Sequence, residues 1–160
     1  MRYLFLVMCA LLGACTKKKE SNVVVATAFS MLVENSNGEN LLKKTTPNYI
    51  NAEALQLSYW INEKKFNVYN SDMDCPTNIC LVNDANFVGL SVVPNDSKDY
   101  EYPLTFIKWE NVDIDTIKCH FNRFEGEESG IICDKVWFND VQMLPNNALT
   151  GLGTAFKIVK

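Results

Sequence analysis

Short apolar runs alternate with turn-forming residues along this chain, and this alternation most restricts the fold it can adopt. From position 55 to 62 every second side chain is apolar or aromatic, a period of two that is typical of a strand with one buried face. The residues on that face are Leu55, Leu57, Tyr59 and Ile61. The polar residues 62–65 then lead into a second run, 66–69, so the two runs predict a β-hairpin.

Similar runs recur through the rest of the chain, separated by Asn, Asp, Gly and Pro. We expect about nine strands: 23–34 as one strand, then 55–62, 66–69, 79–82, 87–93, 104–109, 114–121, 131–138 and 155–159. Strands of this length bury one face most easily as two packed sheets. The expected fold is therefore an all-β, two-sheet antiparallel sandwich, transthyretin-like or immunoglobulin-like, with a closed β-barrel as the alternative.

The first residues have the pattern of a lipoprotein signal peptide. Arg2 precedes an apolar stretch, and Leu12-Gly13-Ala14-Cys15 forms a small-residue cleavage box that ends in cysteine. An apolar stretch of about ten residues is too short for a helix to cross a bilayer about 30 Å thick. We expect residues 1–14 to be removed, residues 15–22 to form a tether lipidated at Cys15, and residues 23–160 to form one domain attached to the membrane through that lipid.

The charge of the chain argues against nucleic acid as a partner. Residues 21–160 carry 11 basic and 18 acidic side chains, a net charge of −7. Binding to phosphates requires clustered Lys and Arg, and only one arginine, Arg123, remains in that part of the chain. We interpret the three lysines 17–19 as a solvated spacer beside Cys15.

Four cysteines belong to the expected domain: Cys75, Cys80, Cys119 and Cys133. An even number in an exported chain predicts two disulfides, for which four cysteines allow three pairings. Cys75 and Cys80 bracket a turn, and the other two lie on runs that flank the turn 125–130, so we predict the pairs 75–80 and 119–133. The C-x4-C spacing does not favour a zinc site, and we expect neither metal nor cofactor.

Trp60 is the aromatic residue that most suggests a binding role, because the alternation places it on the polar face with Gln56, Ser58 and Asn62. An exposed indole there could contact a protein or glycan partner. The alternative is that Trp60 packs beneath the segment 41–50 or against a neighbouring strand. We assign Trp109 and Trp137 to the core.

Catalysis has little support in the sequence. The single histidine, His120, is expected to face outward, and the chain contains no G-x-S-x-G motif. Asp113 and Asp115 would share one strand face and could bind calcium or act as an acid–base pair, although charge near a turn usually serves solvation. We therefore expect a protein that is not an enzyme, with a periplasmic hydrolase as a weak alternative.

Five segments, 37–42, 55–60, 115–119, 132–139 and 156–160, give the chain a resemblance to small secreted lipoproteins of Bacteroidetes bacteria. The resemblance implies a β-sandwich on a lipid anchor and carries over no catalytic or binding residue. The basic segment 16–20 departs from the acidic pattern of surface-exported members, which favours an outer-membrane position facing the periplasm. The tripeptide Asp115-Thr116-Ile117 matches the O-glycosylation pattern of such bacteria, with Thr116 as acceptor, but is also an ordinary strand sequence.

These observations predict a lipid-anchored protein of the cell envelope whose β-sandwich binds a protein or glycan partner without catalysis. The alternative is a structural or assembly subunit of an envelope complex.

Overall fold

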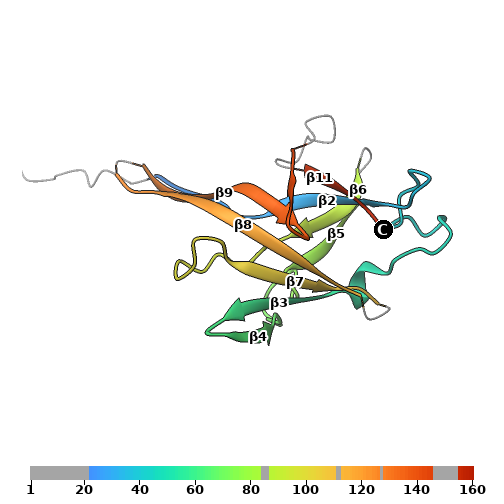
Figure 1. Ribbon diagram of the computed structural model, residues 1–160, viewed down its shortest axis with the longest axis horizontal. Coiled ribbons are helices and arrows are strands. Elements are labelled where there is room, and N and C mark those ends of the chain that lie inside the picture. The colour runs from blue at the N-terminus through green and yellow to red at the C-terminus, as the bar shows by residue number, and fades with distance from the viewer. Residues whose placement is uncertain (1–21, 84–86, 111–112, 127, 146–154) are drawn as a thin grey trace, which may run out of the picture.

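The computed structural model describes residues 22–83, 87–110, 113–126, 128–145 and 155–160, which form two β-sheets packed face to face (Figure 1). The larger sheet contains β1 (Asn22–Ala26), β3 (Gln56–Ile61), β4 (Lys64–Asn67), β7 (Leu104–Lys108), β8 (Ile114–Phe124), β9 (Glu128–Phe138) and β10 (Val141–Met143). The smaller sheet contains β2 (Phe29–Glu34), β5 (Ile79–Asn83), β6 (Val88–Val92) and β11 (Ala155–Val159).

The strand order confirms the two-sheet sandwich and corrects its expected antiparallel pairing. The order is β1-β9-β8-β7-β3-β4 in the larger sheet, with β10 also paired to β9, and β11-β2-β6-β5 in the smaller. Both sheets are open, so the described strands do not form the closed barrel. Each sheet is mixed, because β1 pairs with β9 and β11 pairs with β2 in parallel.

The expected single strand 23–34 is two strands in different sheets. β1 ends at Ala26 and β2 begins at Phe29, and the chain crosses from the larger to the smaller sheet between them. β1 is exposed at Val23, Val24 and Val25, whereas β2 is buried from Phe29 to Val33. The two halves of one β-branched run therefore have different environments.

The predicted hairpin is confirmed as β3 and β4, with a tighter turn than expected. Asn62 and Glu63 have φ angles of 48° and 61°, and β4 begins at the next residue. Positive φ at both central positions characterises the two-residue hairpin turn whose twist matches its strands. Before β3, residues Ala52–Ala54 form a short 3-10 helix (η2), which corrects the assignment of residues 51–57 to the strand on their apolar period of two.

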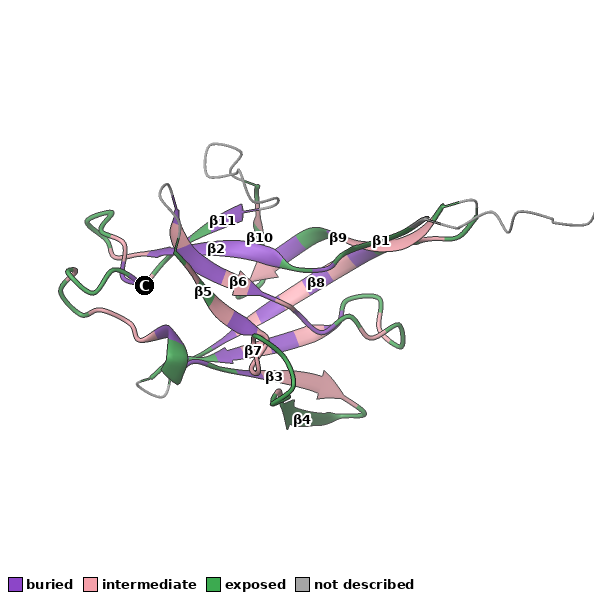
Figure 2. Ribbon diagram, turned by 180° about the vertical axis from the view of Figure 1, so that it is seen from behind, coloured by how far each residue is buried: buried purple, intermediate pink, exposed green. Residues whose placement is uncertain are grey.

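The core lies between the inner faces of the two sheets, shown in purple in Figure 2. The larger sheet contributes Leu57, Ile107, Ile117, Cys119 and Val136, and the smaller contributes Met31, Val33, Leu90, Val92, Phe156 and Ile158. Tyr59 links the layers, because its hydroxyl donates a 2.7 Å hydrogen bond to the carbonyl of Val93 after β6. Burial raises the pKa of Tyr59, which keeps its phenol neutral.

Strands β8 and β9 extend beyond the smaller sheet as a ribbon, with β1 along one edge (Figures 1 and 2). Their register shifts between His120 and Phe121, so that His120 pairs with Lys135 and Phe121 pairs with Cys133. β1 approaches β9 closely at Gly130, where an added Cβ would lie 2.4 Å from the carbonyl oxygen of Val24. Gly130 is therefore part of the reason that β1 can pair there.

The expected signal peptide and the lipidation site Cys15 lie outside the described residues, as does most of the expected tether. Within the described ranges, the structure contains no helix of the length and apolarity that crossing a membrane requires.

Candidate binding face

The outer face of the larger sheet brings together aromatic and cationic side chains from five adjacent strands. In register, Ser58 lies between Asn67 on β4 and Phe106 on β7. Farther across the sheet, Lys118 on β8 is opposite Trp137 on β9. Strand alternation places all of these side chains on the face away from the core, because Leu57, Ile107 and Ile117, their neighbours along the strands, are buried.

Trp60 lies on this outer face, as the alternation predicted, but it is half-buried. Its ring packs against Phe106 of the neighbouring strand, with the ring centres 6.3 Å apart and the planes at 67°. This edge-to-face geometry is favourable for an aromatic pair. Trp60 therefore combines the two predicted alternatives, since it is on the solvent-facing side and also packs on a neighbouring strand.

Beside Phe106 the sheet surface is hollowed, with a volume of about 240 Å³. The hollow is lined by one ring, two amides, one hydroxyl, two ammonium groups and one aliphatic side chain: Phe106, Gln56, Asn67, Ser58, Lys65, Lys108 and Ile114. The Nζ atom of Lys65 lies 3.7 Å from the centre of the Phe106 ring, and Ser58 donates a 2.9 Å hydrogen bond to Asn67. This hollow offers both stacking and hydrogen bonding to a ligand.

A second aromatic group lies farther along the same face. The ring of Tyr102 is 5.5 Å from Trp137 and 5.7 Å from His120. Trp137 is half-buried on the outer face, which corrects its assignment to the core: it is opposite Lys118, whereas its chain neighbour Val136 points inward. The phenol of Tyr102 donates a hydrogen bond to the carboxylate of Glu101, and this bond together with the charge of Glu101 raises the pKa of Tyr102 and keeps its phenol neutral.

His120 faces outward as predicted, and its described partners do not form a catalytic triad. Its Nδ1 atom lies 2.6 Å from a carboxylate oxygen of Asp134, and its ring contacts Tyr102. A hydrolytic site of this type also requires a serine or cysteine nucleophile within hydrogen-bond reach of the imidazole. The described polar contact of His120 is with a carboxylate, so the geometry gives the hydrolase alternative no support.

The acidic pair Asp113 and Asp115 converges as the sequence suggested, but Lys160 neutralises both carboxylates. Its Nζ atom forms ion pairs with Asp113 and with the buried Asp115. Trp109, buried as predicted, donates a 2.7 Å hydrogen bond to Asp115. A hollow of about 280 Å³ adjoins this group, with Lys160 among its lining residues. The ammonium group of Lys160 thus occupies the position between the two carboxylates that a calcium ion would need. The arrangement has a structural role, because it connects β8 to the residue that follows β11.

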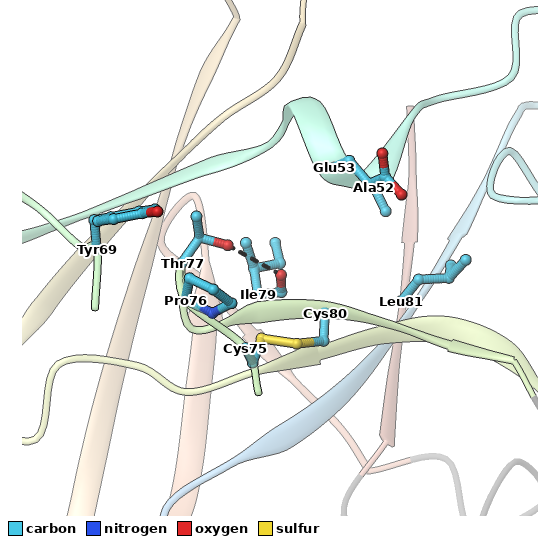
Figure 3. A pocket seen from close by; sticks show the side chains of 9 residues that line it. All are labelled: Ala52, Glu53, Tyr69, Cys75, Pro76, Thr77, Ile79, Cys80 and Leu81. Carbon is cyan, nitrogen blue, oxygen red and sulfur yellow. Dashed lines mark hydrogen bonds between the residues drawn. A yellow bond between two sulfur atoms is a disulfide. The ribbon is translucent and has the colours of Figure 1, made fainter. Parts of the chain in front are cut away.

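The disulfide between Cys75 and Cys80 confirms the first predicted pair, with Cα atoms 5.9 Å apart. It lines a hollow of about 410 Å³ between η2 and β5 (Figure 3). Thr77 in the same loop donates a 3.2 Å hydrogen bond to the carbonyl of Ile79. Glu53 is the one charged residue of this lining, so the hollow has less varied chemistry than the one on the sheet face.

The second predicted pair, Cys119 with Cys133, is present as two buried free thiols. The predicted hairpin does form, but the register shift places Cys119 opposite Val136 and Cys133 opposite Phe121. The two cysteines are therefore diagonal neighbours and not directly opposed. A hydrogen bond between the thiols, together with burial, raises the pKa of Cys119 and holds it in the neutral form.

Comparison of the chain with models of protein families, with curated proteins and with solved structures found no match. Among the described residues, no three His, Cys, Asp or Glu side chains are grouped as a metal site would require.

The most informative residues of the outer face were not singled out from the sequence. Phe106 and Lys108 are two apart on β7, so alternation alone could have placed them together. Lys65 lies on the same face as these two residues, because it pairs with Trp60 across the hairpin. The missing information was the order of the strands, because β7 lies beside β3 only in the folded sheet.

Proposed function

We propose that this chain is a lipid-anchored envelope protein whose β-sandwich binds a glycan, without catalysis, through the outer face of its larger sheet. The observation that supports this function is the hollow beside Phe106. Sugar rings bind proteins through aromatic faces and through planar amide groups that match their hydroxyls. Phe106, Gln56, Asn67 and Ser58 supply both kinds of contact within about 240 Å³.

A glycan fits this face better than a protein partner. The hollow has three neutral polar side chains around one ring, and the neighbouring Gln56 and Asn67 are exposed. The centre of a protein interface is usually a more apolar, fully desolvated cluster. A protein partner is accordingly the alternative outcome of the binding experiment.

The binding experiment uses the mature, acylated protein in detergent micelles, first on a glycan array and then by calorimetry with each glycan that binds. Phe106→Leu removes the ring and retains apolar volume, and should weaken binding at least about tenfold. The matched control is Phe66→Leu, because Phe66 is also partly exposed but is opposite Tyr59, on the other face of the sheet.

Two results would contradict glycan binding: an array without any bound glycan, or affinities that Phe106→Leu leaves unchanged. A protein that crosslinks to the wild type in envelope extracts and is lost with Phe106→Leu would favour the protein-binding alternative.

The anchor is tested separately at Cys15. Two acyl chains hold a protein firmly at a membrane, whereas the chain without them has no such attachment. Cys15→Ser should therefore leave the protein unlipidated by mass spectrometry and move it to the soluble fraction. Unchanged membrane association of this variant would argue against the anchor, and it would leave the glycan proposal standing.

A further inference from the structure

The hollow beside Phe106 is cationic in a protein that is otherwise acidic. Lys65 and Lys108 both line it, and none of its lining residues is acidic. Among the described parts of the chain, neither ammonium group has an acidic partner, whereas Lys118, Lys157 and Lys160 each pair with a carboxylate. Two unneutralised charges at one hollow attract an anion.

The position of Lys65 couples this charge to the aromatic ring. In the free protein its ammonium lies 3.7 Å above the centre of Phe106, a cation–π contact that satisfies the charge in part. A sugar that stacks on the same face of the ring would displace the ammonium group. The displaced ammonium would then be free to pair with an acidic substituent of that sugar.

Polar neighbours complete the set of donors. Ser58 donates to Oδ1 of Asn67, which fixes the amide so that its Nδ2 group remains available as a donor. Gln56 is opposite Lys108 in the register, so a second amide accompanies the second lysine. The hollow thus presents two charged and two amide donors around one ring.

We propose that this hollow binds an anionic sugar residue, with its carboxylate or sulfate group held by Lys65 and Lys108 and its apolar face on Phe106. The inference rests on the proposed glycan-binding function and specifies the ligand class. The requirement for a charged group distinguishes this inference from the recognition of neutral glycans, because the ring and the amides alone would bind a neutral sugar equally well.

The test compares charged and neutral forms of the same glycans by calorimetry with the mature, acylated protein. One pair is a hyaluronan hexasaccharide and its carboxyl-reduced form, and the other is a carrageenan hexasaccharide and its desulfated form. At least one charged member should bind more than about fivefold tighter than its neutral counterpart, and added salt should weaken only the charged form. The pair that shows the difference identifies the anionic group.

Variants assign the effect to the hollow. Lys65→Met and Lys108→Met should each reduce affinity for the charged glycan by about threefold to fivefold relative to the neutral form. Lys44→Met is the matched control, because Lys44 is an exposed lysine that does not line the hollow. Melting temperatures of all three variants should match the wild type, since the substitutions are on the surface.

Equal binding of charged and neutral forms would overturn the inference and leave glycan binding intact. Charge-dependent binding that Lys44→Met weakens as much as Lys65→Met would also overturn it, because general attraction would then replace a defined site. Failure of both pairs together with an empty glycan array would remove the proposed function as well.

Discussion

The indole Nε1 of Trp109 donates a hydrogen bond of 2.7 Å to Oδ2 of the buried Asp115. The other oxygen of this carboxylate, Oδ1, accepts a 2.7 Å hydrogen bond from Asn139, and Lys160 forms an ion pair with Oδ2. Trp109 directly follows β7, and Asn139 lies in the turn between β9 and β10, all strands of the larger sheet, whereas Lys160 directly follows β11 of the smaller one. One carboxylate therefore connects the two layers at this end of the sandwich.

Asp115→Ala should lower the free energy of unfolding by about 3 kcal/mol, because it leaves the buried indole of Trp109, the amide of Asn139 and the ammonium of Lys160 without their acceptor. Urea unfolding measures the loss. Asp113→Asn is the control, since the Asp113 side chain is 61% exposed and its pair with Lys160 should contribute less than about 1 kcal/mol. Equal effects of the two substitutions would show that Asp115 does not have this connecting role.

Gly130→Ala should detach β1 from β9. The new Cβ would meet the Val24 carbonyl at 2.4 Å and the Phe124 ring at 2.7 Å, and backbone cannot move aside as a side-chain end can. Hydrogen exchange should show lost protection of the amides in β1, with little change in the core strands. Ser129→Ala, one residue away, should leave this protection intact, and retained protection in Gly130→Ala would contradict the close approach.

Trp60→Ala should cost about 1 to 2 kcal/mol of stability. This falls between the negligible cost of an exposed residue and the larger cost of a core tryptophan, because the indole is half-buried against Phe106. Thermal melting provides the measurement. A stability loss as large as that of a core tryptophan would place Trp60 among the buried residues and remove it as a contact for the glycan.

The free energy of unfolding should fall as the pH rises above about 8.5, the ordinary thiol pKa. Cys119 has a raised pKa in the folded protein, so above that pH the unfolded chain loses the thiol proton first and is stabilised relative to the folded state. The contribution is fully present below pH 8.5. Urea unfolding from pH 7 to 10 should show this slope, and Cys119→Ala should flatten it.

A count of thiols provides the control for this prediction. Within residues 23–160, the unfolded, unreduced protein should expose two reactive thiols, Cys119 and Cys133, whereas the folded protein should resist alkylation there because both are buried. A peptide map in which these two cysteines are joined would show the second disulfide that the sequence predicts. It would contradict the pH prediction, because Cys119 would then have no thiol proton to lose.

Local sequence patterns were sufficient for the elements whose partners are close along the chain. Alternation correctly placed Leu57 inside and Trp60 outside on β3, and the turn signal predicted the hairpin to β4. The bond between Cys75 and Cys80 followed in the same way from a short intervening turn.

Features set by distant partners could not be predicted. The run 23–34 contains no turn residue, so its division into β1 and β2 is decided by the separate sheets that receive them. The register shift between His120 and Phe121 changes which residues oppose Cys119 and Trp137, and no local sequence pattern indicates this shift. The hollow depends on the adjacency of β3 and β7, which are separated by more than forty residues of sequence.

The two parallel pairs have a consequence for the speed of folding. β1 pairs with β9 and β2 pairs with β11, so each joins residues more than one hundred positions apart. The conformational entropy of closing loops of that length is lost before these pairings contribute any stability. Domains dominated by such contacts fold in milliseconds to seconds. Until β9 and β11 arrive, the apolar edges of β1 and β2 remain open to pairing with other chains, so folding competes with aggregation for the whole of that interval.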